Sequence, residues 1–347
     1  MYSAAGKFSV KVTVKDKDGG VSPAVLVPVT VVTRATPLND LGTGTYLGFA
    51  GGLYPGGLNQ MPAAHAVAGT ARARAVVPRD ATGAPAPGGR IVLLSVGMSN
   101  TTQEWCSFSS LPPCDPWTFT GQALADPSVN HTSLLILNGA KPGFQALFWD
   151  QPTDSAYDRV RDQVLVPAGV TEAQVQVVWL KSAIAGGVAS LPGSAADAYN
   201  LLAYLGKTVR AMRIRYPNLA IVYLSSRSYG GYALPTSVNP EPYAYETGFG
   251  VKWLIGAQIT QMTSGKVDPR AGDLNYNTVA PWVAWAPYLW ANGTTPRSDG
   301  LFWVRSDFEL DAIHPSQAGE TKVGGMLLQF FKTEPTAACW FLAGGQC

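Results

Sequence analysis

Four apolar runs of strand length, at 91–96, 133–137, 175–180 and 219–224, leave few folds open to this chain. Each run is almost continuously apolar, as in IVLLSV over 91–96, where a half-exposed strand would alternate apolar and polar residues. Continuous runs are typical of strands that are buried on both faces of a parallel sheet. Helical segments lie between the runs, so we predict an α/β fold with right-handed crossovers.

Two of the intervening helices have clear signals. Over 195–216, apolar residues recur at steps of three and four, and Pro217 follows directly. A second helix is expected over 316–331. We therefore predict that 90–347 forms a three-layer α/β/α domain around a mainly parallel, five-stranded sheet. Ligands of such sheets bind at the carboxyl ends of the strands, which is where functional residues are to be sought.

The N-terminal part has a different pattern. Residues 8–15 alternate apolar and polar residues, and 24–32 form a second apolar run after the turn DKDGG, which predicts a β-hairpin. This segment, 1–35, resembles the last two strands of a PKD-type β-sandwich; the alternative is a strand pair that packs on the main domain. The residues that carry this resemblance are Gly6, Phe8, Val10, Val12, Val14, Asp16 and Gly19. The glycine-rich segment 36–89 is predicted to be an ordered connector, with Tyr54 and Asn59 bordering a cleft.

The four cysteines form two local pairs, Cys106 with Cys114 and Cys339 with Cys347, each eight positions apart. No histidines cluster with them as in a metal site, so two disulfides are expected and free buried thiols are the alternative. Disulfides indicate an oxidising compartment, so we predict a secreted or cell-surface protein of bacterial extracellular or periplasmic type.

Charge and hydropathy exclude other classes of protein. The formal net charge is only +2 and 14% of residues are charged, with no basic block, which argues against nucleic acid or an anionic membrane as a partner. No apolar run reaches the roughly 18 residues that a membrane span needs.

Two motifs point to nucleophilic catalysis. The first strand ends in Gly97-Met-Ser99-Asn, where the glycine lets the backbone turn and present the serine hydroxyl. Of the three histidines, only His314 follows an acid at a spacing of three, in Asp311-Ala-Ile-His-Pro, directly before the last helix. Asp311 can accept the Nδ1 proton of His314, which leaves Nε2 free to act as a general base toward Ser99.

With these motifs the region from Arg90 to Phe331 resembles the SGNH (GDSL-like) hydrolase superfamily, in the Gly-x-Ser-Asn form of sialate O-acetylesterase-like members. The resemblance implies a catalytic triad of Ser99, His314 and Asp311, and an oxyanion hole that includes the backbone N–H groups of Ser99 and Gly139. It also implies a third donor, an asparagine after the third strand, but this chain has Lys181-Ser-Ala there. Candidate replacements are Lys181, Asn100 and Asn138; the alternative for Lys181 is a side chain that points to solvent.

Arg227 and Tyr229 follow the fourth strand, where they could bind substrate, although local pairing is the alternative for Arg227. We expect a secreted serine ester hydrolase that removes O-acetyl or other short acyl groups from carbohydrate. Its substrate would be a small-molecule or polysaccharide ester, and neither a metal nor an organic cofactor is implied. The alternative is a non-catalytic carbohydrate-binding or surface module that keeps the fold.

Overall fold

The computed structural model describes residues 6–31 and 35–347. Its centre is a sheet of five strands in the order β6-β5-β7-β8-β9, and every neighbouring pair is parallel. The strands are β5 (Ile91–Gly97), β6 (Leu134–Asn138), β7 (Val175–Lys181), β8 (Ile221–Leu224) and β9 (Trp282–Trp285). The predicted fold class is therefore confirmed, and the four apolar runs of the sequence correspond to β5, β6, β7 and β8.

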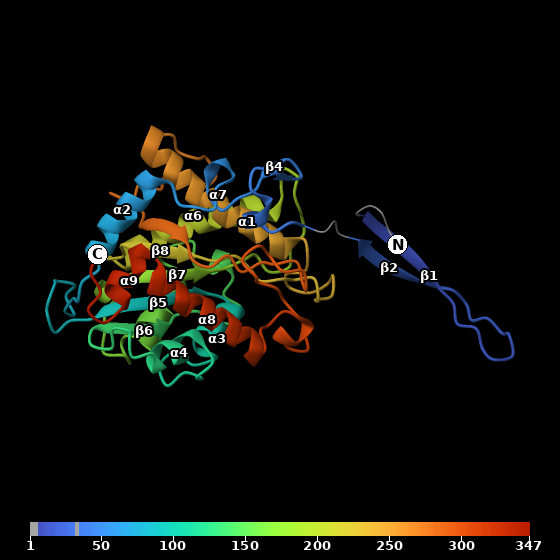
Figure 1. The fold of residues 1–347 in the computed structure, drawn as a ribbon, viewed down its shortest axis with the longest axis horizontal. Helices are drawn as coiled ribbons and strands as arrows, with labels where there is room; N and C mark the ends of the chain where they lie inside the picture. Colours follow the sequence, from blue (N-terminus) through green and yellow to red (C-terminus); the bar gives the residue numbers. More distant parts are fainter. Residues whose placement is uncertain (1–5, 32–34) are drawn as a thin grey trace.

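Helices cover both faces of this sheet (Figure 1). One face carries α5 (Ser155–Val160), α6 (Asp197–Arg215) and α7 (Tyr243–Ser264). The other carries α2 (Ala63–Arg74), α3 (Ser99–Cys106), α4 (Phe119–Ala125), α8 (Gln317–Thr333) and α9 (Pro335–Phe341). The two helices predicted from the sequence are α6 and α8.

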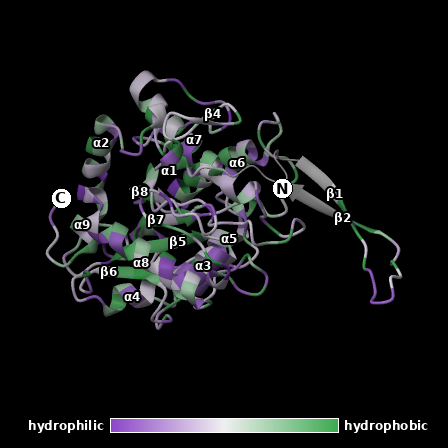
Figure 2. Ribbon diagram, turned by 45° about the vertical axis from the view of Figure 1, so that its right-hand side comes forward, coloured by the Kyte–Doolittle hydropathy of each residue, from purple (hydrophilic) through white to green (hydrophobic). Residues whose placement is uncertain are grey.

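Alternate residues of each strand belong to the two different cores. In β5, Val92 and Leu94 pack with the α5–α6–α7 layer, whereas Ile91 and Leu93 pack with the opposite layer. All of these side chains are at most 2% exposed. Figure 2 shows β5 and β6 in the green of apolar residues between helices of mixed colour. The continuous apolar runs thus follow from burial of the sheet on both faces.

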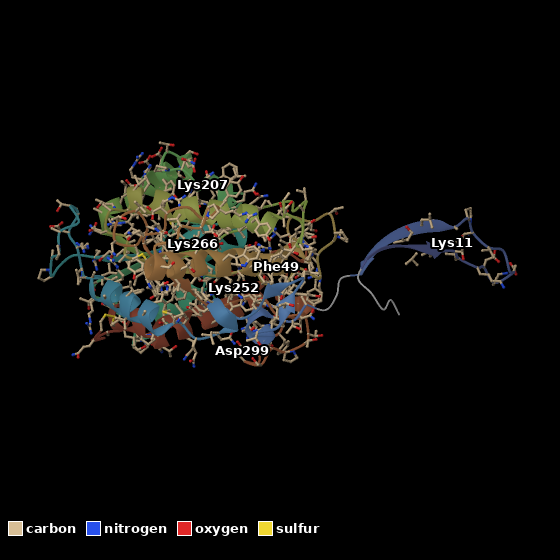
Figure 3. All side chains as sticks on the ribbon, turned by 90° about the horizontal axis from the view of Figure 1, so that it is seen from above. Lys11, Phe49, Lys207, Lys252, Lys266 and Asp299 are labelled. Atoms are coloured by element: carbon tan, nitrogen blue, oxygen red, sulfur yellow. A yellow bond between two sulfur atoms is a disulfide. The ribbon has the colours of Figure 1, made fainter. Side chains whose placement is uncertain are left out.

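The N-terminal hairpin consists of β1 (Gly6–Val12) and β2 (Val25–Val31), paired antiparallel with Val10 opposite Val27. The predicted hairpin is therefore present, apart from position 32, which lies outside the described residues. It lies apart from the α/β domain, as the position of Lys11 in Figure 3 also shows. Its interpretation as a PKD-like remnant stays a prediction.

The glycine-rich connector contacts α7. It contains α1 (Leu38–Leu41) and the short strands β3 (Thr45–Tyr46) and β4 (Phe49–Ala50). The Lys252 ammonium of α7 donates hydrogen bonds to the carbonyl oxygens of Ala50 and Gly51, and Phe49 packs against Trp253 (Figure 3). Beyond this loop the connector includes the 12-residue helix α2, which was not predicted from the sequence.

No helix in the described part of the chain has both the length and the apolar character that crossing a membrane requires.

Candidate active site

The turn after β5 places Ser99 at the carboxyl end of the sheet. Gly97 has a φ of 150°, and a Cβ at this position would lie 2.0 Å from the carbonyl oxygen of Lys181 on the neighbouring strand. Only glycine fits there, because any side chain would collide with the backbone of β7. Ser99 is the first residue of α3, so its backbone N–H belongs to the turn of the helix that lacks acceptors within the helix.

Ser99, His314 and Asp311 form a hydrogen-bonded chain. His314 Nε2 lies 2.8 Å from Ser99 Oγ, and His314 Nδ1 lies 2.5 Å from Asp311 Oδ2. The other carboxylate oxygen of Asp311 accepts the backbone N–H groups of Ile313 at 2.9 Å and of His314 at 3.0 Å. The three side chains that the sequence motifs single out are thus brought together, with His314 only partly exposed.

The electrostatics of Asp311 suit this arrangement. Burial raises the pKa of the Asp311 carboxyl, but the hydrogen bonds from the His314 ring and from two backbone N–H groups outweigh burial, so the pKa lies below its usual value. The carboxylate therefore stays ionised and holds the Nδ1 proton of His314. With Nδ1 protonated, Nε2 has a free lone pair that can take the proton of Ser99 Oγ.

Gly139 directly follows β6, the strand that neighbours β5, and β5 leads into the turn with Ser99. Ser95 of β5 is in register with Asn138 of β6, so Gly139 follows directly beside the turn that carries Ser99. The Asn138 side chain points inward: its Oδ1 accepts the Ser95 hydroxyl at 2.7 Å, and its Nδ2 donates to the backbone carbonyl of Ser109 at 2.8 Å. The carboxamide of Asn138 is thus bound within the fold.

Lys181 is buried and paired with a carboxylate. Its ammonium lies 2.5 Å from the carboxylate of Glu104 on α3, and both side chains are only 1% exposed. Burial is the largest influence on both groups: it lowers the pKa of Lys181 to about 8 and raises the pKa of Glu104 above its usual value. The solvent-facing alternative is therefore wrong, and the ammonium is engaged by a carboxylate. A lysine that ends a buried strand needs an acidic partner, but the sequence does not mark which of the acids it is.

Asn100 and Arg227 are also buried, and they contact each other. Asn100 is 1% exposed; its Nδ2 donates to the carbonyl oxygen of Ile313 at 2.7 Å, and its Oδ1 accepts a hydrogen bond from Arg227 Nη1. Arg227 is 3% exposed, and burial lowers the pKa of its guanidinium, whereas Glu104 and Asp311 are among the carboxylates that oppose the shift. Arg227 is thus bonded to a residue of α3 that lies 127 positions away, and the Asn100 amide is directed at the loop that carries His314.

The remaining predicted binding residues differ in position. Tyr54 is 4% exposed and belongs to the apolar core, and its part in binding substrate stays a prediction. The Asn59 carboxamide bonds to the backbone of the connector, donating to Asn39 at 2.7 Å and accepting from Leu53 at 3.3 Å. Tyr229 lies in the loop after β8, with its ring edge-on to Tyr232 at a centroid distance of 5.0 Å.

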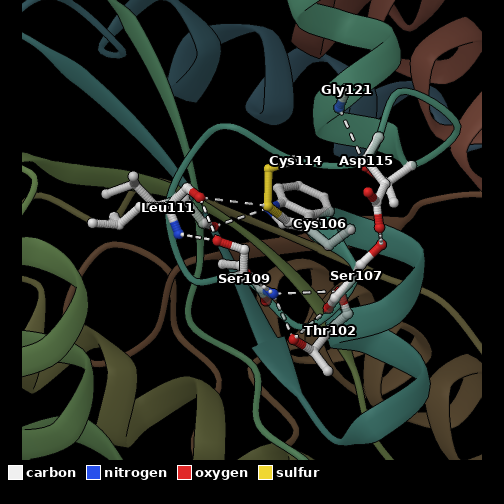
Figure 4. The surroundings of a disulfide bond; sticks show 12 residues. Thr102, Cys106, Ser107, Ser109, Leu111, Cys114, Asp115 and Gly121 are labelled. Atoms are coloured by element: carbon white, nitrogen blue, oxygen red, sulfur yellow. Dashed lines mark hydrogen bonds between the residues drawn. A yellow bond between two sulfur atoms is a disulfide. The ribbon is translucent and has the colours of Figure 1, made fainter.

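Both predicted disulfides are present. Figure 4 shows Cys106–Cys114 closing the loop that follows α3, where the Ser107 hydroxyl donates to the Asp115 carboxylate at 2.5 Å. The bond ties the C-terminal end of the serine's helix to its following loop. Cys339–Cys347 likewise joins the last residue to α9.

The other two histidines have structural environments. His65 is 4% exposed, stacks on Trp282 and places Nε2 2.9 Å from the carbonyl oxygen of Val283. His131 places Nε2 3.0 Å from the carbonyl oxygen of Asp126. Within 6–31 and 35–347, no three His, Cys, Asp or Glu side chains are grouped so that they could hold a metal ion.

Comparison with known proteins gives only distant likenesses. No family model matches the chain, and no curated protein matches its sequence. Among solved structures, it is similar to an extracellular lipase from Streptomyces rimosus, with 14% identity, coverage of 69% of this chain and 99% of the lipase, and a TM-score of 0.31. It is also similar to a carbohydrate esterase family 2 enzyme from Corynascus thermopiles, with 12% identity, 70% and 66% coverage and a TM-score of 0.36. A salicylyl-acyltransferase from a tetracycline biosynthetic pathway matches with 13% identity, covering 73% of this chain and 58% of that one at a TM-score of 0.36. None of these likenesses decides what the chain does.

Proposed function

We propose that this chain is a serine ester hydrolase of the SGNH type. The observation that carries the proposal is the chain of contacts from Ser99 Oγ through the His314 ring to the Asp311 carboxylate, at 2.8 and 2.5 Å. These distances lie within hydrogen-bond reach for a nucleophile, its base and the group that orients the base.

The reaction proceeds by acyl transfer in two steps. Ser99 Oγ attacks the ester carbonyl carbon while His314 Nε2 takes the serine proton, and the same proton then passes to the leaving alcohol. Water attacks the resulting acyl-enzyme with His314 again as base, which releases the acid and restores the serine. The N–H groups of Ser99 and Gly139 are the donors proposed for the oxyanion.

We assign the substrate class as O-acetyl or other short acyl esters of carbohydrate, outside the cell or in the periplasm. The Gly-x-Ser-Asn motif and the two disulfides support this assignment. A non-catalytic carbohydrate-binding module with this fold is the competing function, and it would bind the sugar without hydrolysing an ester.

The test is hydrolysis of p-nitrophenyl acetate by the parent and by single variants. Ser99→Ala and His314→Ala should each remove nearly all activity, because both disable the same proton transfer. His65→Ala and His131→Ala serve as matched controls and should keep most of it. Labelling by an organophosphonate should require Ser99 and modify that residue. Activity of Ser99→Ala equal to that of the parent would refute the proposal in favour of the binding module.

A further inference from the structure

The residue after the proposed nucleophile connects two distant parts of the site. Asn100 lies on α3 directly after Ser99, and Ile313 directly precedes His314 in the last loop. The Asn100 Nδ2 donates to the Ile313 carbonyl oxygen at 2.7 Å across 213 positions of sequence. This hydrogen bond therefore joins the backbone that carries the nucleophile to the backbone that carries the base.

Arg227 determines which way the Asn100 carboxamide faces. Its Nη1 donates to Asn100 Oδ1, so the amide nitrogen is left to face Ile313. The guanidinium is 3% exposed and lies near the Glu104 carboxylate, which attracts it and also binds Lys181. Because the guanidinium is enclosed on all sides, it has little freedom to move, which makes Arg227 a rigid support for Asn100.

The loop that holds His314 needs support from outside. Ala312 has a φ of 59°, in the left-handed region that alanine rarely adopts. Residues persist in such conformations only where surrounding contacts hold them. The Asp311 carboxylate holds the loop from within, through the N–H groups of Ile313 and His314. The Asn100 side chain holds it from outside, at the Ile313 carbonyl oxygen.

We propose that Asn100 and Arg227 are positioning residues: together they fix the 311–314 loop so that His314 Nε2 stays within reach of Ser99. Neither side chain takes part in the bond changes at the ester. The proposal rests on the proposed function of Ser99 and His314. It gives Asn100 a role different from the oxyanion donor that the sequence suggests.

The decisive variant is Asn100→Asp. It keeps an oxygen to accept from Arg227, but it replaces the donor to Ile313 with a second oxygen, which repels the carbonyl. We expect kcat for p-nitrophenyl acetate to fall by about 10- to 100-fold with an unchanged KM, as for a small displacement of a catalytic group. Arg227→Lys keeps a cation near Glu104 but loses the planar donor, and should show a smaller change in the same direction. If Asn100→Asp does not fold, the Arg227→Lys variant is used for the test.

The second measurement reports on His314 without any substrate. With ¹⁵N-labelled histidine the chain gives signals from only three rings, which His→Ala variants assign. In the parent, the His314 nitrogens should show a proton on Nδ1 and a bare, hydrogen-bonded Nε2. In Asn100→Asp we expect a mixture of tautomers, because the ring is no longer held between Asp311 and Ser99.

Asn239→Asp is the matched control. Asn239 is also 1% exposed, and its Nδ2 donates to a loop carbonyl oxygen, that of Ile184, at the same distance of 2.7 Å. It should lower the melting temperature about as much as Asn100→Asp, yet leave the His314 signals of the parent. This control separates a loss of positioning from a general loss of stability.

Two results would overturn the proposal. One is His314 signals identical to those of the parent in both Asn100→Asp and Arg227→Lys. If kcat fell with those signals unchanged, Asn100 would act directly on the substrate or the oxyanion. The other is the same disturbance of His314 in Asn239→Asp. Failure of the proposed function is a separate result, since Ser99→Ala would then keep its activity whatever the His314 signals show.

Discussion

Lys181→Met removes the ammonium from the buried pair with Glu104 and leaves a side chain of similar length. Both partners are 1% exposed, so the Glu104 carboxylate would be left in the interior without the group that lies 2.5 Å away. Loss of one partner from a buried pair is strongly destabilising, because the other charge stays buried without compensation.

The loss in free energy of unfolding has an upper limit, because the remaining partner can become neutral by gaining or losing a proton. At pH 7, protonating a carboxyl whose ordinary pKa is about 4.3 costs about 4 kcal/mol, at about 1.4 kcal/mol per pH unit. Arg227 makes the total loss smaller than this limit, since its charge stabilises the Glu104 carboxylate that stays ionised. For Glu104→Gln the remaining partner is Lys181. Deprotonating a lysine, whose ordinary pKa is about 10.4, costs about 5 kcal/mol at pH 7.

The two variants should respond to pH in opposite directions. In Lys181→Met the folded state holds a proton on Glu104 that the unfolded state releases, so stability falls as the pH rises above about 4.3. In Glu104→Gln the unfolded state holds a proton that folded Lys181 has lost, so stability rises with pH up to about 10.4. The free energy of unfolding should therefore be measured in urea at pH values of about 5, 7 and 9.

The double variant Lys181→Met/Glu104→Gln completes the cycle and should be more stable than the sum of the two single losses predicts. Additive losses, or pH slopes of the same sign in both single variants, would refute this account of the pair. So would a fall in kcat of about 10²-fold for Lys181→Met with unchanged stability, which would make the lysine an oxyanion donor.

Four further changes test the loop, one buried acid and one disulfide. Asp311→Asn should lower kcat by up to about 10⁴-fold, since a neutral amide does not fix the tautomer of the base; full activity would contradict its role. Ala312→Gly should raise the free energy of unfolding by about 1 kcal/mol, because glycine tolerates the left-handed φ of 59°, and a lower value would contradict this. Burial raises the pKa of Glu246 to about 7. The parent should therefore lose stability as the pH rises toward 7, and Glu246→Gln should make that slope in urea unfolding smaller, with Glu320, whose pKa burial also raises to about 7, supplying part of what remains; an unchanged slope would refute the assignment. Replacing Cys106 and Cys114 together by serine should cost about 2.5 kcal/mol on the chain-entropy model, and an unchanged urea midpoint would contradict it.

The strands were predictable because burial on both faces leaves a continuous apolar run. The prediction for 175–180 agrees with β7 to within one residue, and that for 219–224 begins two residues before β8. Helix α7, over Tyr243–Ser264, was not predicted, because it is buried around most of its circumference and so lacks the amphipathic period of α6. The fifth strand, Trp282–Trp285, is only four residues long and gives too short a signal.

The three residues of the proposed triad could be located because each belongs to a local motif at the end of a strand or the start of a helix. The buried pairs could not. Lys181 and Glu104 are 77 positions apart, and Arg227 and Asn100 are 127 apart, with no spacing that marks them as partners. Tertiary packing determines which side chains form such pairs. A short stretch of sequence does not contain that information.

On the proposed function, the order in which a ribosome makes this chain determines when its chemistry can begin. Ser99 and His314 are 215 positions apart, so at about 5–20 residues per second the serine emerges roughly 10 to 40 s before its base. Until the loop that carries His314 reaches α3, Ser99 has no base within hydrogen-bond distance. On the proposed function, the first turnover by a newly made molecule therefore marks the completion of its last layer, and a ribosome release assay for esterase activity would time that event.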